Sequence, residues 1–191
     1  MYGLVNYQLI GIQKGIQYGH GKDEYTLVMI DMLENGFNNL DVYKQYKEWL
    51  KYHKTYIILN GGTTNNNPKK LGTLNKHLNT LTEQGIYCTT FYEPDLGDQL
   101  TSINFIVDER VFGKDDNKQY KWKNFKDWLL DNPSAYILDI PFFDKKTSEI
   151  EEMFKTSTLP EYNDLYNQWV IYMGGYKNVF LRRWLENFNL A

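Results

Sequence analysis

The sequence predicts an α/β protein with a small mixed β-sheet flanked by helices and a helical C-terminal extension. Short runs of β-branched and aromatic residues predict strands, and the amphipathic segments that alternate with them predict helices. These elements follow the order β-α-α-β-α-β-β, which favours one mixed sheet. The 191 residues, of which 42% are hydrophobic, are enough to form a packed core.

Each predicted element follows from a local pattern. Four runs rich in β-branched and aromatic residues predict strands over residues 4–10, 55–59, 86–92 and 101–107. A first helix is expected from about Lys14, where glycines at 15, 19 and 21 would allow close packing against the sheet. A second is expected over residues 41–52, with Asp41 as its cap. Leucines at 71, 74, 78 and 81 predict a third, which Gly85 ends.

The character of the chain changes after Asp108. Residues 113–121 are charged and lack helical or strand periodicity, and aromatic-rich helical segments are expected over 122–130, 148–154 and 162–188. The last segment is interrupted at Gly174-Gly175. Because no further strands follow, we expect an α/β domain over residues 1–112 and a helical extension over 113–191 that packs on it.

Composition narrows the range of partners. The formal net charge is −3, and arginine occurs only at positions 110, 182 and 183, so a nucleic acid would have to meet a local basic patch. No apolar run reaches the roughly 20 residues of a membrane span, and the first residues do not resemble a secretory signal. A single cysteine, Cys88, fits a reducing compartment. We therefore expect a cytoplasmic protein without a membrane partner.

The sequence gives no sign of a metal site or of a bound cofactor. The histidines at 20, 53 and 77 and Cys88 lack the spacing of metal ligands, and the loop at 60–67 does not match the phosphate-binding pattern of nucleoside triphosphatases. Cys88 lies in a predicted strand beside Tyr87, so we expect it in the core. No metal and no cofactor are expected.

The most informative segment is Gln13 to His20. A strand runs into a turn containing Lys14, and Gln17-Tyr18-Gly19-His20 follows on the next helix. With the order of elements over residues 4–107, an acidic turn at 93–97 and Thr101 opening the last strand, this part of the chain resembles the type 2 peptidyl-tRNA hydrolase family. It looks most like divergent members carried by bacteriophages. In the family the lysine lies seven residues before the histidine, where this chain has Gln13, and Lys14 follows one residue later.

The resemblance implies a hydrolase and suggests roles for individual residues. Lys14 would supply positive charge near phosphates or an oxyanion, His20 and Gln17 would share a helix face toward one cleft, and Asp95 or Glu93 would act as the general base. Gln13, Gln17, Glu93 and Thr101 are the expected ligand-binding residues of this region. Ordinary alternatives remain open: an exposed lysine, a histidine within the helix–sheet interface, and Asp and Pro that only shape a turn.

The polar loop at residues 60–67 is a second candidate binding element. Gly61 and Gly62 would let backbone amides approach a ligand, and Thr63 and Thr64 offer neutral hydrogen bonds. The alternative is a flexible surface connection.

Two functions compete at this stage. One is a peptidyl-tRNA hydrolase-like protein that acts on or binds an RNA 3′ end. The other is a non-catalytic bacteriophage protein of the same fold that sequesters a nucleotide immune signal of the cyclic-dinucleotide or ADP-ribose type, as an anti-defence sponge in the host cytoplasm. The expected partner is thus tRNA or a small nucleotide, with a homodimer as a further possibility. An interaction module formed by the aromatic C-terminal helices has the least support.

Overall fold

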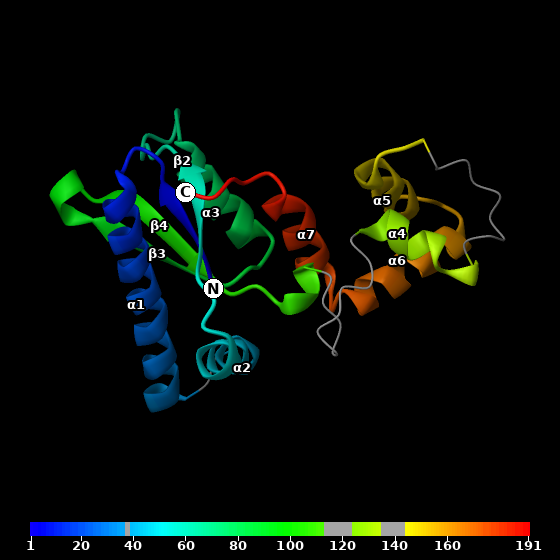
Figure 1. The fold of residues 1–191 in the computed structure, drawn as a ribbon, viewed down its shortest axis with the longest axis horizontal. Coiled ribbons are helices and arrows are strands. Elements are labelled where there is room, and N and C mark those ends of the chain that lie inside the picture. The colour runs from blue at the N-terminus through cyan, green and yellow to red at the C-terminus, as the bar shows by residue number, and fades with distance from the viewer. Residues whose placement is uncertain (37–38, 113–123, 135–143) are drawn as a thin grey trace. The chain divides into compact units, whose positions relative to one another are not determined.

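The computed structural model describes residues 1–36, 39–112, 124–134 and 144–191 (Figure 1). The chain forms two compact units, one of Met1–Val107 together with Asn187–Ala191 and the other of Asp108–Glu186. The division therefore falls at Val107 rather than at residue 112, and the last five residues belong to the first unit. The charged stretch predicted at 113–121 lies outside the described residues.

The first unit contains a four-stranded mixed sheet flanked by helices, which confirms the predicted mixed α/β class. Its strands lie in the order β2-β1-β4-β3, with β1 parallel to β2 and antiparallel to β4, and β3 antiparallel to β4. Their bounds are β1 (Tyr2–Asn6), β2 (Ile57–Gly62), β3 (Cys88–Glu93) and β4 (Gln99–Phe105). The first strand ends at Asn6 and not at Ile10, because α1 (Gly11–Asn35) already starts at Gly11 and the intervening residues form the turn.

Helices cover both faces of this sheet. Val5 of β1 lies in a core with residues of α1, whereas Leu4 lies beside Leu74 of α3 (Thr73–Glu83), close to Gly61. Successive residues of a strand point to opposite faces, so α1 and α3 lie on opposite sides of the sheet. Between α1 and β2 the chain forms α2 (Leu40–Glu48) and a π-helical turn (Trp49–His53), close to the predicted helix at 41–52.

Close packing of α1 on the sheet depends on Gly21 alone among its predicted glycines. A Cβ at Gly21 would collide with the side chains of Asn104 and Ser102, whereas a Cβ at Gly15 or Gly19 would meet nothing within 4 Å. The expectation that all three glycines permit close packing is therefore wrong for two of them. Gly15 and Gly19 lie on the part of the helix surface that does not touch the sheet.

The last five residues extend the sheet beyond β2. The amide of Asn60 donates to the Asn189 carbonyl at 2.9 Å, and the amide of Ala191 donates to the Ile58 carbonyl at 3.0 Å. Leu59 and Leu190 form an antiparallel bridge between these bonds. This short segment pairs with the outer edge of β2, which would otherwise present unpaired backbone groups.

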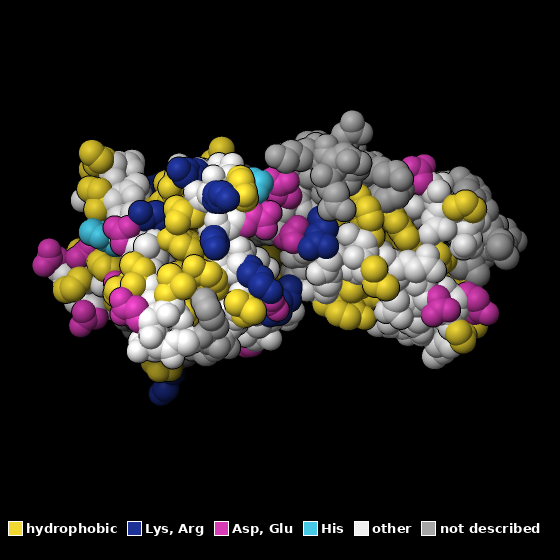
Figure 2. Space-filling model, turned by 90° about the horizontal axis from the view of Figure 1, so that it is seen from below, with side chains coloured by type: hydrophobic (Ala, Val, Ile, Leu, Met, Phe, Trp, Pro, Cys, Tyr) yellow, Lys and Arg dark blue, Asp and Glu magenta, His cyan; other side chains and the backbone are white. Residues whose placement is uncertain are grey.

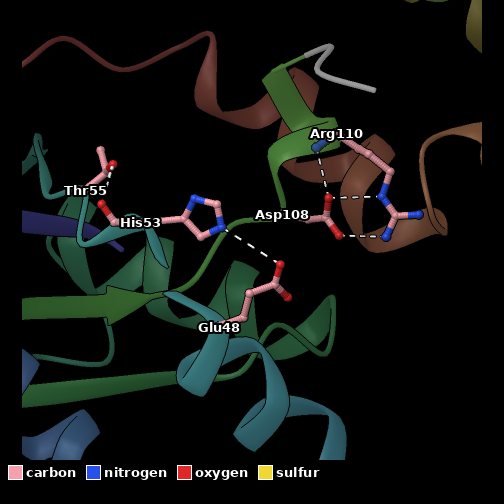
Figure 3. Close-up of polar contacts among 5 residues, drawn as sticks. All are labelled: Glu48, His53, Thr55, Asp108 and Arg110. Atoms are coloured by element: carbon pink, nitrogen blue, oxygen red, sulfur yellow. Dashed lines mark hydrogen bonds and ion pairs between the residues drawn. The ribbon is translucent and has the colours of Figure 1, made fainter. Parts of the chain in front are cut away.

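The second unit is helical and has its own core. It contains a 3-10 turn (Glu109–Phe112), α4 (Phe125–Leu130), α5 (Thr147–Lys155), α6 (Pro160–Tyr172) and α7 (Tyr176–Leu185). Among the described residues of this unit, eleven buried ones from α4 to α7 and the Met173 turn form one cluster, in which Phe125, Phe154 and Trp169 are fully buried. The predicted break at Gly174-Gly175 separates α6 from α7. At its start, Arg110 forms two side-chain hydrogen bonds to Asp108, at 3.0 and 2.7 Å (Figure 3).

In the described ranges, none of the helices combines the length and the apolar character needed to cross a membrane.

Candidate functional site

The site forms where α1 runs antiparallel to the edge strand β3. Three contacts fix the register: Gln17 bonds to Glu93, the Gly21 carbonyl accepts from the Thr89 hydroxyl at 3.0 Å, and Tyr25 packs edge-on against the Tyr87 ring. The helix residues are four apart, and the residues they contact, at 93, 89 and 87, are an even number of positions apart, so the contacts repeat on the same faces. This register places the N-terminal part of α1 beside the β3–β4 hairpin.

A β-bulge supplies the third element of the site. Phe91 pairs with Ser102 and Tyr92 pairs with Leu100, so Thr101 is an extra residue of β4 without a partner on β3. In a regular strand Thr101 would point away from α1, because its neighbour Ser102 lies under Gly21 of that helix. A bulge changes the direction of a side chain, and the Thr101 hydroxyl accordingly reaches α1.

Gln17, Glu93 and Thr101 form a hydrogen-bonded group, which we call the Gln17 cluster. The Thr101 hydroxyl donates to Gln17 Oε1 at 2.6 Å, and Gln17 Nε2 donates to Glu93 Oε2 at 2.5 Å. Gln17 is 7% exposed and Thr101 is fully buried, whereas Glu93 is half-buried. The Glu93 carboxylate is therefore the solvent-accessible end of a chain of donors that starts in the core.

His20 and Lys14 lie on the same part of α1. The imidazole of His20 stacks on the Phe91 ring with centroids 4.6 Å apart and planes inclined by 27°. His20 is exposed, and Phe91 and Lys14 are half-buried. Lys14 precedes Gln17 by three residues and Gly21 by seven, so it lies on the stripe of α1 that faces the sheet. The helix thus aligns a cation, the Gln17 cluster and an exposed aromatic ring.

Two of the predicted site residues have other positions. Gln13 accepts a hydrogen bond from the Ile10 amide through Oε1 at 3.3 Å, and this contact closes the first turn of α1. Asp95 is exposed on the 3-10 turn Pro94–Leu96 that connects β3 to β4. Of the two carboxylates proposed as a general base, the Gln17 cluster contains Glu93.

Close packing against α3 requires glycine at both glycine positions of the 60–67 loop. Gly61 is the extra residue of a second bulge, since Val5 pairs with Asn60 and Asn6 with Gly62. A Cβ at Gly61 would collide with Leu74, and one at Gly62, where φ is +80°, would collide with the Thr73 side chain. Both glycines let the start of α3 approach the end of β2.

The polar groups of the same loop bond within the protein. The Thr63 amide donates to the Thr73 hydroxyl at 2.8 Å, and the Thr64 hydroxyl donates to the Leu100 carbonyl at 2.5 Å. The loop is therefore anchored to α3 and β4, and the hydroxyls of Thr63 and Thr64 already have partners within the protein. Its asparagines bond to the same parts of the fold: Asn65 and Asn66 to Asn75, and Asn66 also to Asp98.

The other histidines and the cysteine lie apart from the Gln17 cluster in the fold. His53 is 3.9 Å from Glu48 in the π-helical turn (Figure 3), and His77 of α3 packs edge-on against Phe188, where burial lowers its pKa. Cys88 is half-buried in β3, and burial raises the pKa of its thiol to about 11. In the part of the chain that the structure describes, no group of three or more His, Cys, Asp and Glu side chains is arranged to hold a metal ion.

The surface charge is mixed on the face that Figure 2 shows. Lysine and arginine side chains lie among acidic and hydrophobic ones there and do not form one continuous basic area. This agrees with the net charge of −3. A polyanion that met this face would find separate cations.

Comparisons with known proteins give no match: no family model fits the chain, and searches of curated proteins and of solved structures find no similar protein. The site is therefore defined by its own geometry.

Phe91 is the site residue that sequence reasoning missed. The alternation of side chains along a strand could have indicated it, because Phe91 and Glu93 are two residues apart and so share a face. Which helix that face meets depends on the packing of α1 against β3.

Proposed function

We propose that the Gln17 cluster, with Lys14 and His20, forms a hydrolytic site for the acyl ester at an RNA 3′ end, as in a peptidyl-tRNA hydrolase. The proposal rests on the meeting of three polar side chains from three different elements. Gln17, Glu93 and Thr101 come from α1, β3 and β4 and are joined by two short hydrogen bonds. All three are among the site residues that the family resemblance suggested, with Glu93 as the alternative to Asp95 for the general base.

Glu93 is the general base in this proposal. Its carboxylate takes a proton from a water molecule as the water oxygen bonds to the acyl carbon. The bond between that carbon and the ribose oxygen then breaks, and the proton passes to the leaving oxygen, so that the products are a free acid and a free hydroxyl. Gln17 holds the carboxylate through Oε2, which leaves Oε1 for the water, and Thr101 fixes the orientation of the Gln17 amide.

Lys14 and the start of α1 supply the positive charge. Lys14 lies in the second turn of a 25-residue helix, whose first-turn amides carry partial positive charge toward the same end. Anionic groups are favoured at such a terminus, and a lysine beside it strengthens the effect. A phosphate or the developing oxyanion of the ester would bind here.

A direct test compares two adjacent carboxylates. Glu93→Gln keeps the shape of the side chain and an acceptor for Gln17 but removes the base, so we expect hydrolysis of peptidyl-tRNA to fall by about 10²–10⁴-fold. Asp95→Asn is the matched control, since Asp95 is exposed two residues away, and its activity should stay within a few-fold of the unmodified protein. Lys14→Ala should lose activity without loss of fold.

The first measurement is turnover of peptidyl-tRNA by the unmodified protein. If it shows no turnover of peptidyl-tRNA, or if Asp95→Asn is as inactive as Glu93→Gln, the hydrolytic assignment to Glu93 is wrong.

We propose nucleotide sequestration without chemistry as the second function. The exposed ring of His20 on Phe91 supports it, because a stacking surface serves binding whether or not Glu93 acts as a base. Mass spectrometry of small molecules released from the purified, heat-denatured protein tests it. Recovery of one intact nucleotide species, together with no turnover of peptidyl-tRNA, would favour this function, and recovery of none with no thermal stabilisation by nucleotides would exclude it.

A further inference from the structure

His20 is exposed while it stacks on Phe91, so its imidazole has a second face that Phe91 does not cover. Phe91 lies against one side of the imidazole at 4.6 Å between centroids. His20 is exposed and Phe91 half-buried, so the histidine ring lies outside the phenylalanine ring. An imidazole in this position shields Phe91 from water and presents its own second face to solvent.

The part of α1 that carries His20 is held against β3 on both sides of this residue. Gln17, one turn before it, is bonded to Glu93, and Gly21, the next residue, accepts the Thr89 hydroxyl. Both bonds tie α1 to the strand that carries Phe91. A ring fixed in advance loses little conformational freedom when a further ring stacks on it, which favours binding.

The spacing between His20, the Gln17 cluster and Lys14 along α1 matches the length of a single nucleotide. At 1.5 Å per residue, His20 lies about 4.5 Å along the helix from Gln17 and about 9 Å from Lys14. One nucleotide spans such a length from its phosphate to its base. A nucleotide with its phosphate at Lys14 would therefore place its sugar ester beside Glu93 and its base at His20.

We propose that His20 is a substrate-positioning residue, on whose exposed face the base of the 3′-terminal nucleotide stacks. This inference rests on the proposed function, and it adds the terminal nucleobase to the features that the site recognises. Recognition by stacking tolerates any base, because each has a π face, but it requires that a base be present.

The test uses the full chain and two short RNAs that end like tRNA. One carries 2-aminopurine as its terminal base, and the other lacks a base at that position. We expect the fluorescence of 2-aminopurine to be quenched on binding and the RNA without the base to bind at least about fivefold more weakly. His20→Ala should abolish both effects, and His20→Phe, which keeps an aromatic ring, should retain them.

His77→Ala is the matched control, because His77 also packs against a phenylalanine, Phe188, in the same unit. It should leave quenching and affinity unchanged, and thermal unfolding of all variants verifies their fold. The proposal is overturned if the unmodified protein binds both RNAs equally, or if His20→Ala still prefers the RNA with a terminal base.

Hydrolysis of peptidyl-tRNA is measured separately, so that the two proposals fail in different ways. Base-dependent binding without turnover would refute the hydrolase and keep the stacking role of His20. Turnover without base dependence would refute the stacking role alone.

Discussion

Replacing Thr101 by valine tests whether the Gln17 cluster is a coupled unit. Thr101→Val keeps the shape of the side chain and removes the hydroxyl that donates to Gln17 Oε1 at 2.6 Å. Thr101 is fully buried and Gln17 is 7% exposed, so water has little access to replace the lost donor. A buried acceptor without its partner typically costs about 1–3 kcal/mol. We expect the free energy of unfolding of the first unit to fall by this amount.

The double variant gives the sharper prediction. Gln17→Met removes the acceptor of this hydrogen bond. When Thr101→Val is added to Gln17→Met, it therefore leaves no acceptor without a donor. The two changes together should then cost less than the sum of the single changes, with a coupling energy of about 1 kcal/mol or more. The half-buried Glu93 can exchange its lost bond for water, so it adds little to the difference.

Amide hydrogen exchange measures these energies for the first unit by itself. Peptides from α1 and β4 report its opening, whereas most tryptophans of the chain lie in the second unit and would dominate a fluorescence signal. If the single and double variants are additive within about 0.3–0.5 kcal/mol, the Thr101–Gln17 bond does not couple the residues and the description of the cluster is wrong.

Three further predictions concern packing and pH. Gly21→Ala should destabilise the first unit by about 1–3 kcal/mol in urea unfolding, because its Cβ would displace the fully buried Asn104. In the control Gly19→Ala the new Cβ meets open space, so this variant should stabilise α1 by up to about 1 kcal/mol. A loss of stability in both variants would contradict this reasoning. Burial raises the pKa of Glu151 from 4.5 to about 7, so the folded second unit holds a proton that the unfolded chain releases, and stability should fall by roughly 3 kcal/mol as the pH rises from about 4.5 to 7. Glu151→Gln should remove this slope, and an unchanged slope would refute the assignment. Because the thiol of Cys88 has a pKa of about 11, iodoacetamide should modify it slowly at pH 8 and faster after unfolding in urea; equal rates would show that the thiol is not protected.

Local patterns predicted the elements well where a single helix or strand determines them. The leucines of α3 and the break between α6 and α7 are examples, since spacing and glycine act within a few residues. The end of β1 was less well predicted, because Tyr7 and Ile10, which suggested that the strand continued, are exposed in the turn before α1. Hydrophobicity does not distinguish a buried strand from an apolar turn.

The sequence by itself determined the mixed α/β class and the order of elements. Both depend on periodicity and residue type, which are properties of short segments. The candidate site residues were named through the resemblance to a known family. Only the tertiary structure decided that Thr101 turns toward α1, that Glu93 and not Asp95 bonds to Gln17, and that His20 stacks on Phe91. Each of these contacts joins residues about 70 to 84 positions apart, through a bulge and a helix–strand register that arise only when the elements pack together.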